Sequence, residues 1–288
     1  MSIRIRVSLV SVAVSIGASA SLVPVGTAVA PVEAAETAEA RVERTIKGKA
    51  ITESSGLARS TYSRPVLFTH NDSGDSARVF AVSKAGRTRA VLRLKGASAV
   101  DWEDISTGPE HSVWVGDIGD NGRSREQITV YRFTEPKRLP RRGRTVKVAT
   151  KKYTFTYPDR PRDAEALLVH PRTGRLFIVT KSAEGDPGIY RAPKKLSRSS
   201  TNTLKRIADA PLKITAGTFS PDGKTRVLSS YTTAYTYRKF AGRPASVTLP
   251  TRRQGESLEV NRRGTEVLLG SEGEKSPVLA IAMTTPPS

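Results

Sequence analysis

The 288-residue chain carries 47 Lys and Arg residues against 27 Asp and Glu residues, a formal net charge of +20, and it contains no cysteine. The lack of cysteine excludes disulfides, a thiolate zinc site and a Cys nucleophile. The charge favours encounters with polyanions, such as nucleic acid, anionic cell-wall polymer or lipid headgroups, but does not choose among them. Aromatic residues are scarce among the clustered bases, so we expect that nucleic acid is not the partner.

The first 34 residues have the three parts of an export signal. Arg4 and Arg6 precede the apolar run "VSLVSVAVSIGASASLVPVG", and small residues follow in "TAVAPVEAAE". We expect cleavage after Ala34, with Ala30 as the alternative, and a secreted, extracellular protein. An uncleaved anchor is the competing interpretation, but Gly and Pro interrupt the run, which is marginal for a hydrocarbon layer of ~30 Å.

The rest of the chain is long enough for one all-β domain of ~200 to 250 residues. We assign residues 35–41 to a linker, residues 42–284 to a single domain and residues 285–288 to a tail. Within the domain no segment is long and apolar enough to span a membrane, and we expect a monomer.

After residue 45 the chain consists of short apolar or alternating runs bounded by Gly, Pro, Asp and Asn, a pattern typical of β-strands. Five stretches repeat one motif of small or polar residues, an apolar position and a turn: "TESSGLARS", "VDWEDISTG", "RDAEALLVHPRTG", "TAGTFSPDGK" and "QGESLEVNRRG". Their apolar positions are Leu57, Ile105, Leu167, Phe219 and Leu258. The intervals are close to the roughly 40 to 50 residues of a four-stranded propeller blade.

Second and third strands follow each motif, and a fourth follows in every unit except the last, which runs out at Met283. The N-terminal "IKGKAITESSGL" resembles "LKGASAVDWEDI", so it has the features of a missing outermost strand. We therefore predict an all-β, five-bladed β-propeller closed by N-terminal residues near 42–52, because closure removes exposed strand edges. The alternatives are a six-bladed propeller and a β-sandwich.

In a propeller blade, the first strand lines the central channel and the second runs antiparallel to it, so the start of one lies beside the end of the other. Glu103, Glu165 and Glu256 each stand two residues before the apolar position of their repeat, and we expect them to converge at one channel mouth. The ends of second strands add further polar side chains: His70, Asp72, Asp117, Asp120, Lys181 and Glu272. Most bases fall on the opposite loops, which include "KRLPRRGRTVK", so an acidic mouth and a basic opposite face are predicted.

Crowded carboxylates repel one another, which raises some pKa values or requires a counter-cation, and their oxygens suit Ca²⁺ or Mg²⁺. The segment "DIGDNG" is not an EF-hand, because the twelfth position from Asp117 is Ile128 rather than Glu. The alternative to a metal is neutralisation of the acids by Lys181, Arg160 or Arg162.

The segments "SGLARS", "THNDSGD", "DWEDIS", "VGDIGDN" and "DAEALLVHPRTGRLFIVTK" resemble the exported, WD40-like propeller proteins of actinobacteria, and "QGESLEVNRRGTEVLLGSEGEKSPV" is similar to the phytase-like, esterase-like propellers. The resemblance covers about residues 51 to 280. It implies an acidic mouth that binds calcium, carried here by Glu103, Asp117, Glu165, Glu256 and Glu272. Propeller phytases also bind phosphate with Lys and Arg, and the mouth of this chain offers only Lys181, Arg160 and Arg162. The chain also has five repeated units, whereas propeller phytases have six blades.

The first functional hypothesis is an exported propeller whose mouth binds Ca²⁺ and a small polar or phosphorylated ligand, with phytase-like or esterase-like, metal-dependent hydrolysis. In it, Glu165 or Glu256 acts as base or ligand, and Lys181 or His70 stabilises a developing anion. The alternative is a noncatalytic binding module that docks on anionic cell-wall polymer through its basic face. A third interpretation is glycoside hydrolysis by paired carboxylates.

Overall fold

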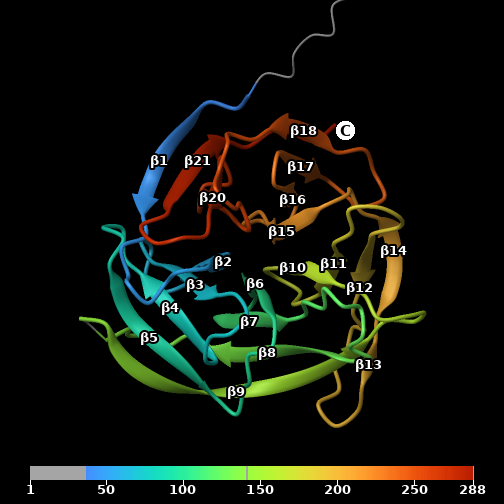
Figure 1. The fold of residues 1–288 in the computed structure, drawn as a ribbon, viewed down its shortest axis with the longest axis horizontal. Helices are drawn as coiled ribbons and strands as arrows, with labels where there is room; N and C mark the ends of the chain where they lie inside the picture. The colour runs from blue at the N-terminus through green and yellow to red at the C-terminus, as the bar shows by residue number, and fades with distance from the viewer. Residues whose placement is uncertain (1–36, 141, 288) are drawn as a thin grey trace, which may run out of the picture. The chain divides into compact units, whose positions relative to one another are not determined.

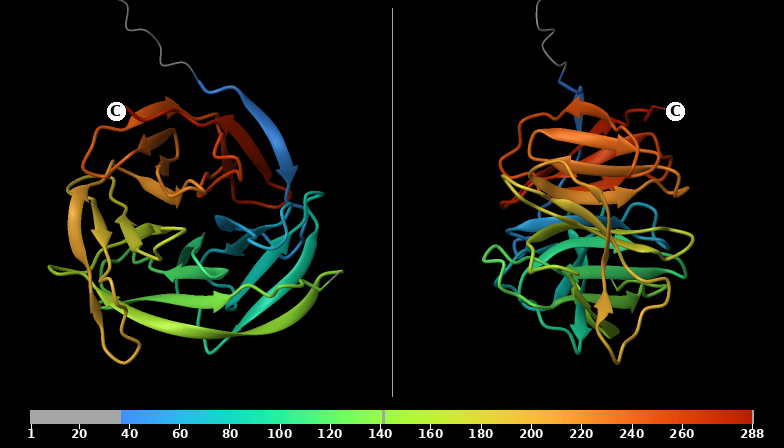
Figure 2. Two further views of the ribbon diagram at one scale, coloured as in Figure 1. Left: turned by 180° about the vertical axis from the view of Figure 1, so that it is seen from behind. Right: turned by 90° about the vertical axis from the view of Figure 1, so that its right-hand side faces the viewer.

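The computed structural model describes residues 37–140 and 142–287, so the predicted signal peptide lies outside the described residues. Every regular secondary-structure element in these two ranges is a β-strand. The strands form four-stranded antiparallel units around one axis (Figure 1). Figure 2 shows the same ring from behind and from the side. The predicted all-β propeller class is confirmed.

Each of the five sequence repeats corresponds to the innermost strand of one unit. The first unit contains β2 (Ser54–Arg59), β3 (Leu67–Asn71), β4 (Arg78–Val82) and β5 (Thr88–Lys95). The second contains β6 (Trp102–Thr107), β7 (Ser112–Asp117), β8 (Ile128–Thr134) and β9 (Arg144–Thr156). The third contains β10 (Ala164–Val169), β11 (Leu176–Thr180), β12 (Gly188–Arg191) and β14 (Lys205–Asp209), while β13 (Asn202–Thr203) pairs with β9. The fourth contains β15 (Ile214–Phe219), β16 (Arg226–Ser230), β17 (Thr233–Tyr237) and β18 (Ala245–Thr248).

The last unit is completed by the N-terminal strand. It contains β19 (Ser257–Val260), β20 (Glu266–Gly270), β21 (Pro277–Ala282) and, outermost, β1 (Ala40–Thr45). β1 begins within the segment predicted to be a linker and is shorter than the predicted closing segment of 42–52, because the chain turns after it. The backbone N–H of Ile51 donates to Gly48 O at 2.9 Å, and Ile46 and Ile51 are both buried. The chain therefore turns inward after β1 toward the start of β2.

Hydrophobic side chains fill the junctions between neighbouring units. Five clusters of buried residues are found in the described chain, and each contains residues from two adjacent units. The cluster between the last and first units contains Leu268 and Val278 together with Leu57 and Phe80. The ring is thus closed by packing as well as by the pairing of β1 with β21.

Buried carboxylates join the innermost strands across the channel. Asp104 on β6 is fully buried, and its Oδ2 accepts from the backbone N–H groups of Leu167 at 2.9 Å and Gly217 at 3.4 Å. Glu259 on β19 similarly accepts from the N–H of Arg59 at 2.8 Å. These bonds satisfy backbone donors at the free inner edges of the units, which would otherwise be unpaired.

The first two units are also joined at the rim. β5 and the first half of β9 pair in parallel, with Ala90 opposite Arg144 and Lys95 opposite Ala149, while the second half of β9 pairs with β8. In the described part of the chain, no helix has the length and apolar character needed to cross a membrane.

Candidate metal centre in the acidic mouth

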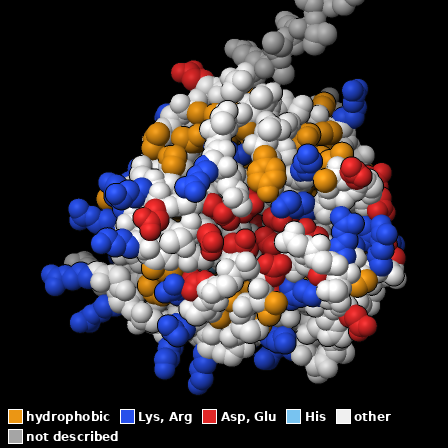
Figure 3. All heavy atoms as spheres, in the orientation of Figure 1, with side chains coloured by type: hydrophobic (Ala, Val, Ile, Leu, Met, Phe, Trp, Pro, Cys, Tyr) orange, Lys and Arg blue, Asp and Glu red, His pale blue; other side chains and the backbone are white. Residues whose placement is uncertain are grey.

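Carboxylates gather at the centre of one face of the ring. Figure 3 shows Asp and Glu side chains there, with Lys and Arg toward the periphery. Three overlapping groups each bring carboxylate oxygens within 4.8 Å of one another: Asp72 with Asp101 and Glu103; Asp72 with Glu256 and Glu272; and Glu103 with Asp163 and Glu165. Because Asp72 and Glu103 each belong to two groups, the seven side chains form one continuous acidic site.

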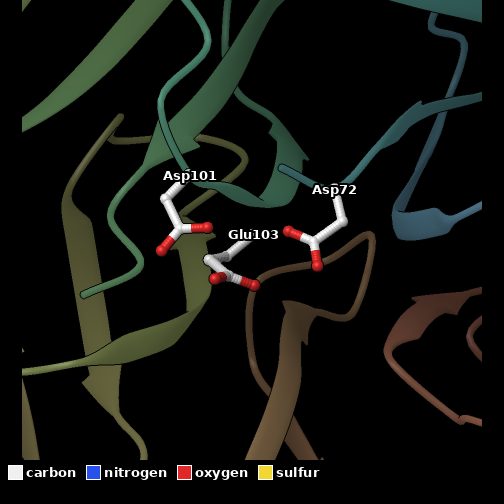
Figure 4. Close-up of side chains that lie close together, drawn as sticks. All are labelled: Asp72, Asp101 and Glu103. Atoms are coloured by element: carbon white, nitrogen blue, oxygen red, sulfur yellow. The ribbon is translucent and has the colours of Figure 1, made fainter. Parts of the chain in front are cut away.

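Strand starts and strand ends supply these side chains. Glu103 and Glu165 are the second residues of β6 and β10, whereas Asp72 directly follows β3. In Figure 4 the carboxylates of Asp72, Asp101 and Glu103 point toward one another. The structure therefore brings together four of the five residues predicted as metal ligands, Glu103, Glu165, Glu256 and Glu272.

Within the described chain, Glu103 is buried in the site with neither a counter-charge nor a hydrogen-bond donor on its carboxylate. Its exposed fraction is 3%, and among the described residues its carboxylate has no hydrogen-bond donor. Burial raises the pKa of Glu103 well above its usual range, and the charges of Glu165 and Asp72 add to the effect. A Cβ at Gly119 would lie 2.1 Å from Glu103 Oε1 and 2.4 Å from Asp101 Oδ2, so a side chain at this position would displace both carboxylates from their present positions.

Other carboxylate oxygens are buried without partners. Asp72 Oδ1 and Glu272 Oε1 have no hydrogen-bond partner among the described residues. Burial raises the pKa of Asp72 to about 6. Burial also raises the pKa of Glu272 to about 9, and a hydrogen bond and repulsion from Glu256 add to it. Without a cation, Glu272 therefore keeps its proton at neutral pH.

Lys181 and Tyr231 connect two of the carboxylate groups. Lys181 Nζ donates to Glu165 Oε1 at 2.6 Å and to the Tyr231 hydroxyl at 3.3 Å, and that hydroxyl donates to Glu256 Oε1 at 3.0 Å. Burial opposes the charge of Lys181, but Glu165 outweighs it and raises the lysine pKa. Burial raises the pKa of Glu165 to about 7 even though Lys181 acts in the opposite direction.

Two predicted site residues have other surroundings. His70 is fully buried, with Nδ1 2.8 Å from Asn71 O and its ring edge against Trp102, and burial lowers its pKa to about 4. With this pKa the ring is neutral at physiological pH, so any stabilisation of a developing anion by His70 would come from a hydrogen bond and not from a positive charge, and that role stays a prediction. Asp117 belongs to none of the three groups, because Arg125 holds its carboxylate at 2.9 Å.

Asp117 instead positions the acidic loop. Its Oδ1 accepts from the backbone N–H of Asp101 at 3.2 Å. The predicted neutralisation by Arg160 and Arg162 is also not what the contacts show, since both guanidinium groups pair with Asp186. Of the three basic residues predicted to neutralise the acids, Lys181 forms an ion pair with a carboxylate of the cluster, that of Glu165.

A small polar pocket adjoins the acidic site. Its volume is about 330 Å³, and its charged lining residues are Arg123, Arg160, Arg162, Lys181, Asp163, Glu184 and Asp186. Since Asp163 belongs to the acidic site and Lys181 contacts Glu165, a ligand in this pocket would lie beside the clustered carboxylates. A larger groove of about 940 Å³ lies between β1, β18 and β21 and contains none of the clustered acids.

Sequence reasoning did not identify Asp101, Asp163 or Tyr231 as site residues, and it placed Asp72 at the mouth without assigning it as a ligand. The motif "DWE" at 101–103 recurs as "DAE" at 163–165, and alternate residues of a strand lie on the same side. This Asp-x-Glu repeat was a signal for Asp101 and Asp163. Tyr231 follows β16 without any comparable repeat.

The comparisons with known proteins support the fold. The chain is similar to the PQQ-bound aldose sugar dehydrogenase of Streptomyces coelicolor, at 12% identity and a TM-score of 0.52, over 85% of this chain and 98% of that chain. It is also similar to a gluconolactonase of Xanthomonas campestris, at 12% identity and a TM-score of 0.50, over 85% of this chain and 90% of that one. No family model and no curated protein matches the chain. At this identity the likeness shows a β-propeller fold and does not extend to chemistry.

Proposed function

We propose that the acidic mouth binds a divalent cation, with Ca²⁺ as the first candidate, and through it a small polar or phosphorylated ligand. One observation carries the proposal: Asp72 Oδ1 and Glu272 Oε1 are buried without a hydrogen-bond partner, and the buried carboxylate of Glu103 faces other carboxylates without a hydrogen-bond donor in the described chain. Such oxygens are costly unless protons or a cation compensate them. The resemblance to phytase-like, esterase-like propellers supports the same assignment.

The donor set fits Ca²⁺ in kind and in spacing. Ca²⁺ takes six to eight oxygen ligands at about 2.3–2.6 Å, so two oxygens on one ion lie at most about 5 Å apart. The oxygens of each group lie within 4.8 Å of one another. Asp72, Asp101 and Glu103 would form one side of such a site, and Glu165, Glu256 and Glu272 are further donors. Mg²⁺ demands stricter octahedral geometry and retains more water, which favours Ca²⁺ in a site of this many carboxylates.

Proton release should accompany cation binding. Three carboxyl groups of the site have raised pKa values, about 6 for Asp72, about 7 for Glu165 and about 9 for Glu272. They therefore release their protons over a range around neutral pH. A cation competes with these protons, so its affinity rises as the pH rises through this range.

The polar pocket indicates a chemical class for the ligand. Arg123, which forms no ion pair with the described residues, and Lys181 would attract a phosphate or carboxylate group, while the cation neutralises the acids beside them. A bound cation would supply Lewis acidity for hydrolysis. Glu165 would act as a base or as a ligand of the cation, and Lys181, which donates to it at 2.6 Å, would stabilise negative charge.

Calorimetric titration of EDTA-treated protein with CaCl₂ tests the metal site. We expect saturable heat, proton release and a higher thermal midpoint, because a ligand at 100 times its Kd stabilises by about 2.7 kcal/mol. Glu103→Gln should weaken binding at least tenfold. The control Glu110→Gln alters a carboxylate on the opposite β6–β7 loop, where its side chain is 83% exposed, and should leave binding unchanged. Absence of both Ca²⁺ heat and a midpoint shift would reject the metal site.

Hydrolysis requires a separate screen. Phosphate esters, carboxyl esters and lactones, the last because one similar structure is a gluconolactonase, are tested with and without Ca²⁺. Loss of turnover in Glu165→Gln with retained folding supports catalysis. Normal Ca²⁺ binding without turnover on any substrate class favours a noncatalytic binding site.

A further inference from the structure

Two segments that contain no acidic residue lie side by side in the folded chain. Residues 76–100 contain six Lys or Arg, residues 136–158 contain eight, and neither contains Asp or Glu. They meet because β5 and β9 pair in parallel between Ala90–Lys95 and Arg144–Ala149. Figure 3 shows basic side chains projecting from the rim on the side where Figure 1 places these strands.

A row of like charges crosses three adjacent strands. Arg93 on β5 lies opposite Arg78 on β4 and opposite Lys147 on β9. Arg78 has a carboxylate partner, Asp75 at 2.8 Å, whereas Arg93 and Lys147 form no ion pair with the described residues. Like charges directly opposite one another destabilise a sheet, so this row costs stability unless an anion compensates it.

The row belongs to a larger surface, which we call the basic rim. Its members are the exposed side chains Arg93, Lys95, Lys147 and Lys151, which strand pairing and alternation place on one face of the sheet. The reverse face of the same strands packs against the hydrophobic cluster between the first two units, through Leu92, Leu94 and Val148. The bases are therefore displayed on a packed sheet rather than on a free loop.

We propose that the basic rim docks a linear phosphate polymer that lacks stacking bases. A linear polymer fits because the charges extend along two strands and across a third, and because none of the pockets described above is lined by them. Nucleic acid fits less well, since single strands are held by exposed aromatic side chains. The exposed aromatic residues of the described chain, Tyr62 and Tyr231, lie outside the basic rim. The surface lies on the strands at the rim, and its Lys147 is also the last residue of the segment "KRLPRRGRTVK", which the sequence assigned to the basic face.

Sodium polyphosphate is the probe, and its binding to the full chain is measured as a function of salt concentration. For Arg93→Glu, we expect affinity to fall on the order of tenfold and the slope of log K against log salt to decrease by about 0.7, the loss of one contact. Arg93→Glu should also fold well, because the new carboxylate lies between Arg78 and Lys147 and relieves their repulsion. Arg93→Gln provides a neutral second variant with a smaller loss.

Lys194→Glu is the matched control, since it makes the same charge change at an exposed loop position outside the basic rim. Wild-type affinity in this control supports the proposal. Equal losses in both Glu variants would show that net charge alone drives binding and would overturn it. No binding of polyphosphate at low salt, or tighter binding of a single-stranded oligonucleotide of equal charge, would overturn it as well. Normal Ca²⁺ titration of Arg93→Glu shows that any loss is independent of the acidic mouth.

Discussion

Replacement of Asp104 by Ala should loosen the junction of three blades. The side chain is fully buried, and it accepts from the N–H groups of Ile105 at 2.8 Å, Leu167 at 2.9 Å and Gly217 at 3.4 Å. A buried donor left without an acceptor costs about 1–3 kcal/mol. Counting the two short bonds gives about 2–6 kcal/mol, and relief from burying a carboxyl group reduces this to about 3 kcal/mol. Burial raises the pKa of Asp104, which is consistent with that relief.

The measurement is thermal and denaturant unfolding followed by circular dichroism. At roughly 2–4 °C per kcal/mol for a chain of this size, Asp104→Ala should lower the midpoint by about 6–12 °C. Ser106→Ala is the control on the same strand, because Ser106 Oγ accepts one bond, from Val169 N at 3.1 Å, and its loss should cost about 1 kcal/mol. A midpoint shift for Asp104→Ala no larger than that for Ser106→Ala would refute the assignment of Asp104 as the polar link between blades.

Two further predictions concern closure and pH. Removal of the chain up to Thr45 leaves β21 unpaired along five register positions and should cost on the order of 3–5 kcal/mol; an unchanged melting midpoint would argue against closure by β1. In EDTA, the melting midpoint should fall as the pH rises from about 5 to 9. The raised pKa values of Asp72, Glu165 and Glu272 mean that, in this range, the folded state holds protons that the unfolded chain has already released. Glu272→Gln should flatten this fall and CaCl₂ should reverse it at pH 8, whereas a midpoint that rises with pH in EDTA would contradict the raised pKa values.

The sequence predicted those residues of the acidic site that occupy equivalent positions in the repeats. Glu103, Glu165 and Glu256 occupy equivalent positions of their repeats, and a radial arrangement of equivalent strands brings equivalent positions together. Asp101 and Asp163 follow the same rule two residues earlier. Repetition does not indicate, however, whether a side chain at a strand end faces the channel or the interior. His70 was assigned to the mouth for its position, yet its ring packs against Trp102.

The sequence also did not predict which carboxylates form ion pairs with nearby bases. Asp117 and Arg125 are eight residues apart, and the chain between them folds back so that the guanidinium removes Asp117 from the set of free carboxylates. Asp104 is adjacent to Glu103, but the alternation of a strand turns it toward the backbone of other blades. Two neighbouring acids thus have different roles, one in the candidate site and the other in the framework.

The amino-acid sequence by itself determined the β-strand pattern, the repeating units and the equivalent positions of their glutamates, because these depend on periodicity along one chain. Tertiary structure alone decided which acids remain unpaired, how far burial raises their pKa values, and that β9 lies against β5. Those properties depend on contacts between residues distant in sequence, and the free energy of a buried charge is set by its neighbours in space rather than along the chain.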